Sequence, residues 1–88
     1  MLKVKKVSAN DDYTLSVELS DGRAGLFDVK PYLDKGVFVQ LQDKEYFKQV
    51  KTLFCGVVWP NEQDLSADTI GYELKQVDST RESKNGYF

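Results

Sequence analysis

The residues that decide the fold run from Asp21 to Asp68. They read DGRAGLFDVKPYLDKGVFVQLQDKEYFKQV (21–50), KTLFCG (51–56) and VVWPNEQDLSAD (57–68). An Asp-Gly turn, a Pro-Tyr-Leu corner, a Gly-Val-Phe turn and a Trp-Pro-Asn exit follow one another in this stretch. Such turn residues separate short apolar segments, which indicates short strands and short helices rather than long helices.

The segment before this stretch predicts an antiparallel β-meander. Residues 2–8 form a first apolar segment, and residues 13–19 alternate between apolar and polar side chains. A strand with this alternation carries its apolar residues on one face. Those residues are Tyr13, Leu15, Val17 and Leu19.

Asp21-Gly22 is typical of a two-residue hairpin turn, in which both residues take a positive φ. This turn would place Leu19 opposite Ala24 and Val17 opposite Leu26. The same register places Phe27 on the other face of the sheet, where a later segment covers it or it stays exposed.

The centre of the chain predicts short helical segments. Pro31 is suited to begin a helical turn because its missing N–H is not needed there, and Gly36 is suited to end it in a left-handed conformation. Residues 37–41 then form a compact apolar turn. Asp43 is expected to cap a short helix that runs from residue 44 to residue 49 or 50.

The last third predicts a second hairpin and a further helix. Residues 50–54 and 56–59 are expected to be strands around a Cys55-Gly56 turn. Pro60 ends the second of these strands because it cannot donate to the ladder, and Trp59 before it is expected to be buried. After a loop over residues 61–64, Ser66 is expected to cap a helix from Ala67 to about Leu74.

These elements predict one α+β domain over residues 1–77. It has a small antiparallel sheet, made of an N-terminal β-meander and a later hairpin, with short helices packed on one face. The polar residues 78–88 are expected to be a flexible C-terminal tail.

The order of these motifs resembles a small bacterial family, domain of unknown function 2442 (DUF2442), from Leu2 to about Glu73. The resemblance implies the same sheet with short helices, and it implies no established activity. Genes for similar proteins often lie beside a gene for another small domain, which implies a toxin–antitoxin-like pair. The structural motif residues are Asp21, Gly22, Asp28, Pro31, Gly36, Trp59, Pro60 and Asp64.

Composition limits the classes of partner. The 88 residues include 12 basic and 14 acidic side chains, for a net charge of −2 and a pI near 5.0. Nucleic-acid binders usually carry a basic surplus, so the lysines at positions 3, 5 and 6 are better explained as protection of an edge strand. The chain has no apolar run of membrane-spanning length and no apolar signal-peptide core. Its single cysteine, Cys55, allows no internal disulfide, and we expect a cytoplasmic location.

Catalytic chemistry has little support in the sequence. The chain contains no histidine, which removes the commonest general base and metal ligand. Cys55 has no second cysteine beside it to form a zinc or redox motif. Asp28, Asp64 and Asp68 are the candidates for metal or acid–base work, but capping of turns and helix ends explains them better. We therefore expect no catalytic residue, no metal and no cofactor.

The aromatic residues suggest a contact surface. Tyr32 and Phe38 lie beside loops, where binding residues tend to gather, and aromatic side chains are enriched at interface centres. The sequence favours a non-catalytic protein-binding module with a small, basic protein partner, in one form the neutralising member of a toxin–antitoxin-like pair. Two alternatives remain open, namely a small-ligand or metal-binding domain that uses Asp28, Asp64 and Asp68, and a transcriptional accessory that contacts DNA. The sequence does not determine the oligomeric state.

Overall fold

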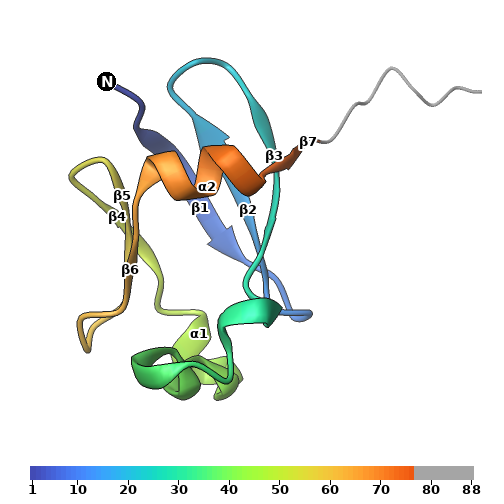
Figure 1. The fold of residues 1–88 in the computed structure, drawn as a ribbon, viewed down its shortest axis with the longest axis vertical. Helices are drawn as coiled ribbons and strands as arrows, with labels where there is room; N and C mark the ends of the chain where they lie inside the picture. The colour runs from blue at the N-terminus through green and yellow to red at the C-terminus, as the bar shows by residue number, and fades with distance from the viewer. Residues whose placement is uncertain (77–88) are drawn as a thin grey trace, which may run out of the picture.

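The computed structural model describes residues 1–76, which form an α+β fold with two antiparallel sheets (Figure 1). The first sheet has the strand order β1-β2-β3-β7 and the second has the order β4-β5-β6. The strands are β1 (Val4–Ala9), β2 (Thr14–Leu19), β3 (Ala24–Asp28), β4 (Lys51–Leu53), β5 (Gly56–Val58), β6 (Asp64–Leu65) and β7 (Lys75–Gln76). The helical elements are the 3₁₀ helices η1 (Lys30–Tyr32) and η2 (Gly36–Gln42) and the α-helices α1 (Lys44–Phe47) and α2 (Ala67–Glu73).

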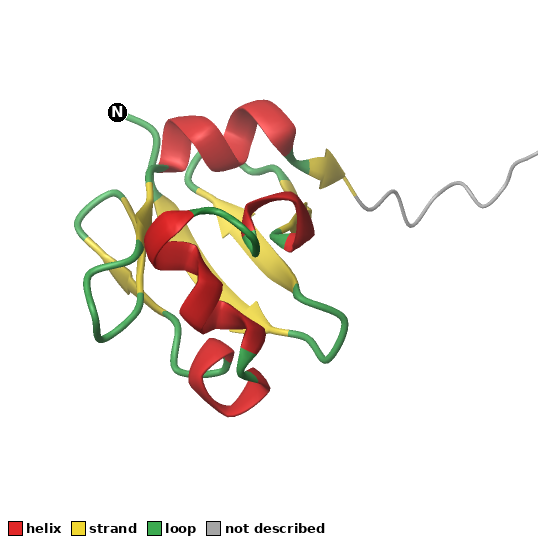
Figure 2. Cartoon of the chain, turned by 60° about the horizontal axis from the view of Figure 1, so that its bottom comes forward, coloured by secondary structure: helices red, strands yellow, loops and turns green. Residues whose placement is uncertain are grey.

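The predicted fold class is confirmed, and the helices lie on one side of the β1–β3 meander (Figure 2). The predicted flexible tail, residues 78–88, lies outside the described residues, so the division at residue 77 stays a prediction. Within residues 1–76, no helix is both long enough and apolar enough to cross a membrane.

The core lies between the meander and the helices. Trp59 is 1% exposed, and its indole Nε1–H donates to the carbonyl oxygen of Phe47 at 2.9 Å. The two rings also stack, with centroids 5.9 Å apart. The prediction that Trp59 is buried is therefore confirmed, and its polar N–H is satisfied as a buried indole requires.

The two sheets meet at their edge strands. β1 is the edge of the first sheet and β4 is the edge of the second, and the two strands run side by side (Figure 1). The backbone N–H of Val4 donates to the carbonyl oxygen of Cys55 at 3.0 Å, which ties β1 to the β4–β5 hairpin. This contact covers part of an edge that would otherwise be open to pairing with another chain.

The predicted turn at Asp21-Gly22 is present, but its type and register were wrong. Gly22 has a φ of 96°, whereas Asp21 is not among the residues with positive φ. The N–H of Gly22 donates to the carbonyl of Leu19, and the N–H of Leu19 donates to the carbonyl of Arg23. The loop therefore has three residues, with a turn followed by a left-handed glycine that forms a bulge.

The extra loop residue shifts β3 by one position relative to β2. Val17 lies opposite Gly25, not Leu26, and Leu15 lies opposite Phe27. A shift of one residue moves each side chain to the other face of the sheet. Phe27 is consequently fully buried in the core, and Leu26 points to the outer face.

The later hairpin also differs from the prediction. Leu53 pairs with Gly56, so the turn residues are Phe54 and Cys55 rather than Cys55 and Gly56. Phe54 takes a φ of 53° and is 90% exposed. Residue 64, predicted to lie in a loop, belongs to the two-residue strand β6, which pairs with β5.

The helix caps are confirmed, and α2 (Ala67–Glu73) has the predicted extent, whereas α1 is shorter than predicted. The Asp43 side chain accepts from the N–H groups of Glu45 and Tyr46, and α1 ends at Phe47. The Ser66 hydroxyl oxygen accepts from the N–H of Thr69 at the start of α2. Gly36 takes the predicted positive φ, 49°, but it begins the helix η2 rather than only ending the turn after Pro31.

Candidate functional site

The fold brings the two predicted contact residues together. The ring centroids of Tyr32 and Phe38 are 5.7 Å apart, and Tyr32 also stacks on the buried Phe27 at 5.9 Å. Both Tyr32 and Phe38 are half-buried and pack against the core. One side of each ring therefore packs against the core, and only the exposed remainder of the ring can contact a partner.

The hydroxyl of Tyr32 is anchored on α2. It donates to the two carboxylate oxygens of Glu73 at 2.9 and 3.1 Å. Partial burial and the adjacent carboxylate both raise the pKa of this hydroxyl above its usual value. Tyr32 is therefore held as a neutral hydrogen-bond donor, which makes it a positioning group for the corner of the fold and not a base.

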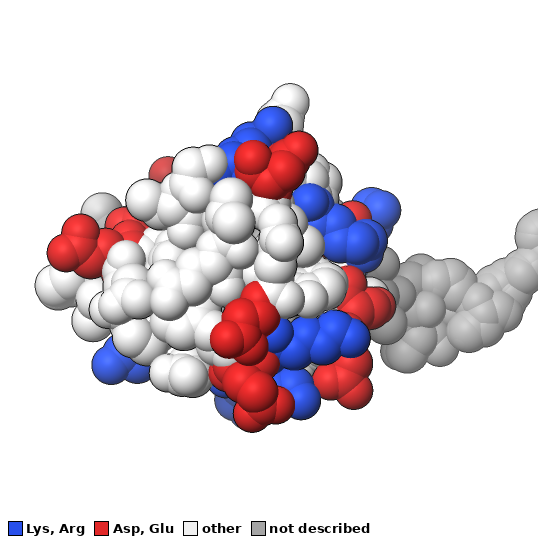
Figure 3. Space-filling view, turned by 90° about the horizontal axis from the view of Figure 1, so that it is seen from below, with Lys and Arg blue, Asp and Glu red and all other residues white. Residues whose placement is uncertain are grey.

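A surface without charged side chains lies next to these rings. Residues 36–42 and residues 52–61 are the two longest runs of the sequence that lack Lys, Arg, Asp and Glu. Figure 3 looks at the end of the molecule that carries η2 and α1, and charged side chains stand mainly around the margin of a broad uncharged area. We define the η2 face by six residues of the two charge-free runs, namely Val37, Phe38, Val39, Gln40, Pro60 and Asn61.

The η2 face exposes aliphatic side chains. Val37 is 66% exposed and Val39 is 46% exposed, on either side of the half-buried Phe38. Neither valine was singled out from the sequence, because a compact apolar turn does not reveal which of its residues face inward. The signal that was available is the charge-free run 36–42, which is unusual in a chain with 30% charged residues.

The buried side-chain amide of Gln63 fixes the conformation of the η2 face through hydrogen bonds. Gln63 is only 2% exposed, and its Nε2 donates to the carbonyl of Val37 at 2.8 Å and to Oε1 of Gln40 at 3.2 Å. The Asn61 side chain donates to the same Gln40 oxygen at 3.0 Å. These bonds join η2 to the loop after Trp59, so two charge-free segments form one continuous surface.

The three aspartates proposed as an alternative site do not form a metal centre. Asp28 ends β3, Asp64 begins β6 and Asp68 lies in the first turn of α2. Within the part of the chain that the structure describes, no three acidic, cysteine or histidine side chains are close enough to hold a metal ion. The metal form of that alternative therefore has no supporting cluster in these residues, and its small-ligand form stays a prediction.

Asp28 has a structural role that fits the capping interpretation. Its Oδ1 accepts from the backbone N–H of Lys30 at 2.9 Å and lies 3.1 Å from the Lys30 ammonium. Partial burial alone would raise the pKa of the Asp28 carboxyl, but these interactions with Lys30 outweigh it and hold the pKa below its usual value. The carboxylate thus fixes the turn that leads from β3 into η1.

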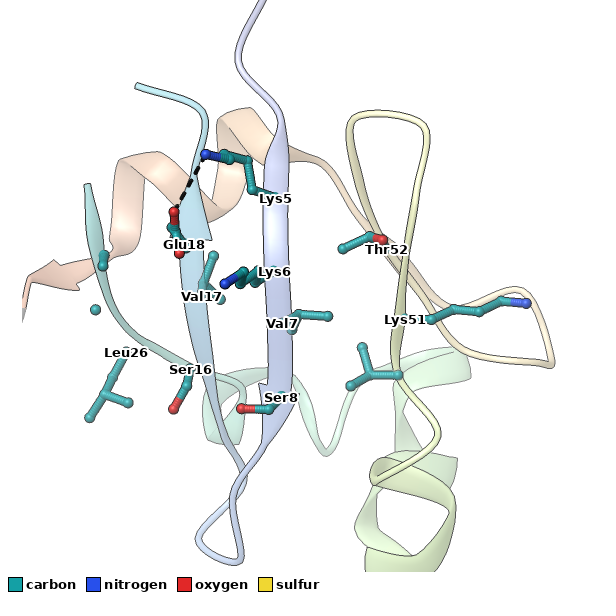
Figure 4. A pocket seen from close by; sticks show the side chains of 13 residues that line it. Lys5, Lys6, Val7, Ser8, Ser16, Val17, Glu18, Leu26, Lys51 and Thr52 are labelled. Carbon is teal, nitrogen blue, oxygen red and sulfur yellow. Dashed lines mark ion pairs between the residues drawn. The ribbon is translucent and has the colours of Figure 1, made fainter. Parts of the chain in front are cut away.

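A second candidate surface is a groove on the other side of the meander (Figure 4). The groove has a volume of about 770 Å³ and lies over the outer face of β1, β2 and β3, with β4 as its wall. Small side chains form much of its floor, which lets a ligand approach the sheet closely. They are Ser8, Ser16, Ala24 and Gly25.

Lysines dominate the charge of this groove. Among residues 1–76, Lys5, Lys6 and Lys51 line it, together with a single acidic residue, Glu18. Figure 4 shows Lys5 directed toward Glu18, with 3.6 Å between its Nζ and the carboxylate, while Lys6 lies over the sheet and Lys51 extends outward from β4. The sequence interpretation gave Lys5 and Lys6 a protective role only, because the groove itself depends on the packing of β4 beside β1.

Comparison with known proteins gives a family and no further relative. Neither the curated proteins nor the solved structures contain a match to this chain. The family model described as "Protein of unknown function (DUF2442)" matches residues 4–76, which includes every strand and helix described above. The motifs that carried the resemblance lie at the turns and corners of this fold, and the chain belongs to the DUF2442 family.

Proposed function

We propose that this domain is a non-catalytic protein-binding module whose partner docks on the η2 face. The observation that carries the proposal is the exposure of Val37 and Val39 on a surface without charged side chains. Interface centres are depleted of charged residues, and binding energy concentrates in a few well-packed apolar anchors. The half-buried Phe38 between the valines supplies the larger anchor.

The rigidity of the surface supports the same proposal. A 3₁₀ helix of seven residues is longer than is usual for this geometry, so it needs support from neighbouring residues. The buried Gln63 supplies that support through its bonds to Val37 and Gln40. A surface that is ordered before binding loses less conformational entropy when the partner arrives.

Charge indicates the kind of partner. The chain has a net charge of −2, and charged side chains stand at the margin of the η2 face. A small basic protein would be attracted to the acidic domain, and its association rate would fall as salt rises. In the stronger form of the proposal, this partner is a toxic protein whose active surface the domain covers.

Co-purification from the native host, with the chain tagged at its C-terminal end, tests the proposal. We expect one small protein in stoichiometric amount. Val37→Asp and Val39→Asp should abolish its recovery, because each introduces a charge into the proposed interface centre. Leu53→Asp is the matched control, since Leu53 is 47% exposed, close to the 46% of Val39, and lies on the β4 edge.

Two results would contradict the proposed interface. Equal recovery of the partner with Val37→Asp and Val39→Asp, in variants that unfold at the wild-type temperature, would place the interface elsewhere. Recovery of nucleic acid in a salt-sensitive complex, with no stoichiometric protein, would contradict the whole proposal and favour the DNA alternative. Toxicity of the partner when it is expressed alone, and its loss on co-expression, tests the stronger form.

A further inference from the structure

We propose that the groove on the outer face of the meander binds a short acidic segment of a partner protein. This site is separate from the η2 face and lies on the opposite side of the β1–β3 sheet from the helices (Figures 2 and 4).

The groove is positive in a protein that is negative as a whole. Its lining among the described residues holds Lys5, Lys6 and Lys51 against Glu18, a formal charge of 3 − 1 = +2, while the whole chain carries −2. Lys75 adds to this side, because it lies directly opposite Leu26 in the β3–β7 pairing. Cross-strand partners share a face of the sheet, and Leu26 lines the groove.

The central lysine is available for a ligand. Lys5 has a partner in Glu18, whereas no ion pair within residues 1–76 involves Lys6. Lys6 is the cross-strand partner of Glu18 in the β1–β2 pair, and both residues line the groove. A carboxylate of the ligand would therefore bind the Lys6 ammonium group inside the groove. Lys51, on a flexible stem at the β4 wall, can then reach a second carboxylate.

The floor offers donors and a patch of apolar surface. The Ser16 hydroxyl oxygen accepts from the Asn10 side chain at 3.0 Å, which leaves the hydroxyl hydrogen to donate to a carboxylate or a peptide carbonyl. Ser8 stands opposite Ser16 on the same face. Leu26 is 37% exposed beside them and gives an apolar side chain of the ligand a place to pack.

These features favour a peptide over nucleic acid. Within the part of the chain that the structure describes, none of the residues that line the groove is aromatic, so these residues offer no platform on which bases could stack. A ligand that crosses β1, β2 and β3 and reaches β4 spans roughly 15 Å, which an extended peptide covers with four or five residues. An apolar residue between acidic ones would place carboxylates near Lys6 and Lys51 and its own side chain on Leu26.

Titration of the ¹⁵N-labelled chain at low salt with the end-blocked peptide Glu-Glu-Leu-Glu-Glu tests this inference. We expect saturable amide shifts at Lys6, Ser8, Ser16 and Leu26 that disappear as salt is added. The neutral peptide Gln-Gln-Leu-Gln-Gln is the ligand control and should cause no saturable shift. An oligothymidylate of similar charge is the nucleic-acid control.

The matched variants remove two lysines each. Lys6→Gln/Lys51→Gln should weaken binding of the acidic peptide about fivefold or more, whereas Lys44→Gln/Lys48→Gln, in α1 and at its C-cap, should leave it unchanged. Glutamine is preferred to glutamate at position 6 because a second carboxylate opposite Glu18 would destabilise the sheet. Thermal unfolding of both pairs shows that any loss of binding is not a loss of fold.

Four results would overturn the inference. They are equal binding of the neutral peptide, shifts that cluster outside the groove, tighter binding of the oligothymidylate in the groove, and no saturable shift up to millimolar peptide. The η2 face is tested independently, because Val37→Asp and Val39→Asp should leave binding of the acidic peptide intact. Failure of one proposal therefore does not imply failure of the other.

Discussion

The hydroxyl of Tyr46 donates to Oε1 of the buried Gln63 at 2.6 Å and at the same time accepts from the backbone N–H of Asn61 at 2.7 Å. Tyr46 is itself buried, and it comes from α1, whereas Gln63 and Asn61 belong to the turn after Trp59. Through Gln63, the same chain of hydrogen bonds reaches the carbonyl of Val37 in η2. One phenol group thus ties the neighbouring elements η2 and α1 to the loop after Trp59, which lies 15 to 17 residues further along the chain than Tyr46.

Removal of that hydroxyl should destabilise the domain more than its size suggests. Tyr46→Phe leaves the Gln63 oxygen and the Asn61 N–H without their partner, at an expected cost of about 1–3 kcal/mol in the free energy of unfolding. Tyr72→Phe is the control, because Tyr72 is 91% exposed and its change should stay within about 0.5 kcal/mol. Urea unfolding measures both. Equal stability of the two variants would show that the network contributes nothing.

Trp59 gives a second test of the core. Trp59→Ala removes a fully buried ring that stacks on Phe47 and should cost about 3–5 kcal/mol, enough to unfold much of a small domain. Trp59→Phe keeps most of the apolar volume but leaves the Phe47 carbonyl unpaired, so its cost should be smaller. Near-UV circular dichroism and thermal unfolding compare them. Wild-type stability of Trp59→Ala would contradict a structural role.

Local chemistry explains what could be predicted from the sequence. Asp43 and Ser66 were identified as caps because an N-cap depends only on a side chain and the next three residues. Gly36 was identified as left-handed because few other residues tolerate that backbone conformation.

Features that depend on tertiary packing could not be predicted in the same way. The register of β3 depends on whether the hairpin loop has two or three residues, and Asp21-Gly22 fits both loops. The strands β6 and β7 have two residues each and exist only because β5 and β3 lie beside them. The same limit applies to the candidate surfaces, since the exposure of Val37 and the groove over Ser16 arise from packing between distant segments.

The pH dependence of stability should reflect Asp28. Its pKa is lower in the folded chain than the value of about 3.9 expected when unfolded, so the folded state binds the proton less readily. The resulting stabilisation is present above about pH 4 and is lost as the pH falls through the folded pKa. Asp12 and Asp21, whose pKa values are also lowered by hydrogen bonds to Thr14 and Arg23, act in the same direction.

Asp28→Asn isolates this contribution, because asparagine keeps an oxygen that can accept from the Lys30 N–H. The variant should be less stable than the wild type at pH 7, and the difference should shrink at pH 3, which lies below the pKa of about 3.9 expected for the unfolded carboxyl. Urea unfolding at the two pH values measures the difference. A gap that stays constant or widens at pH 3 would show that the charge of Asp28 does not stabilise the turn.

The last prediction concerns Phe54, which combines a φ of 53° with 90% exposure at the tip of the β4–β5 hairpin. An aromatic residue in the left-handed region is strained by roughly 1–2 kcal/mol, and its exposed ring recovers little of that cost by packing. Phe54→Gly should therefore raise the free energy of unfolding by about 1 kcal/mol, because glycine adopts positive φ without strain. Phe54→Ala is the control, since alanine loses the ring but keeps the strained backbone. If alanine matches the wild type while glycine is more stable, the strain lies in the backbone. A glycine variant that is less stable than both would show that the ring contributes more to the fold than its exposure indicates.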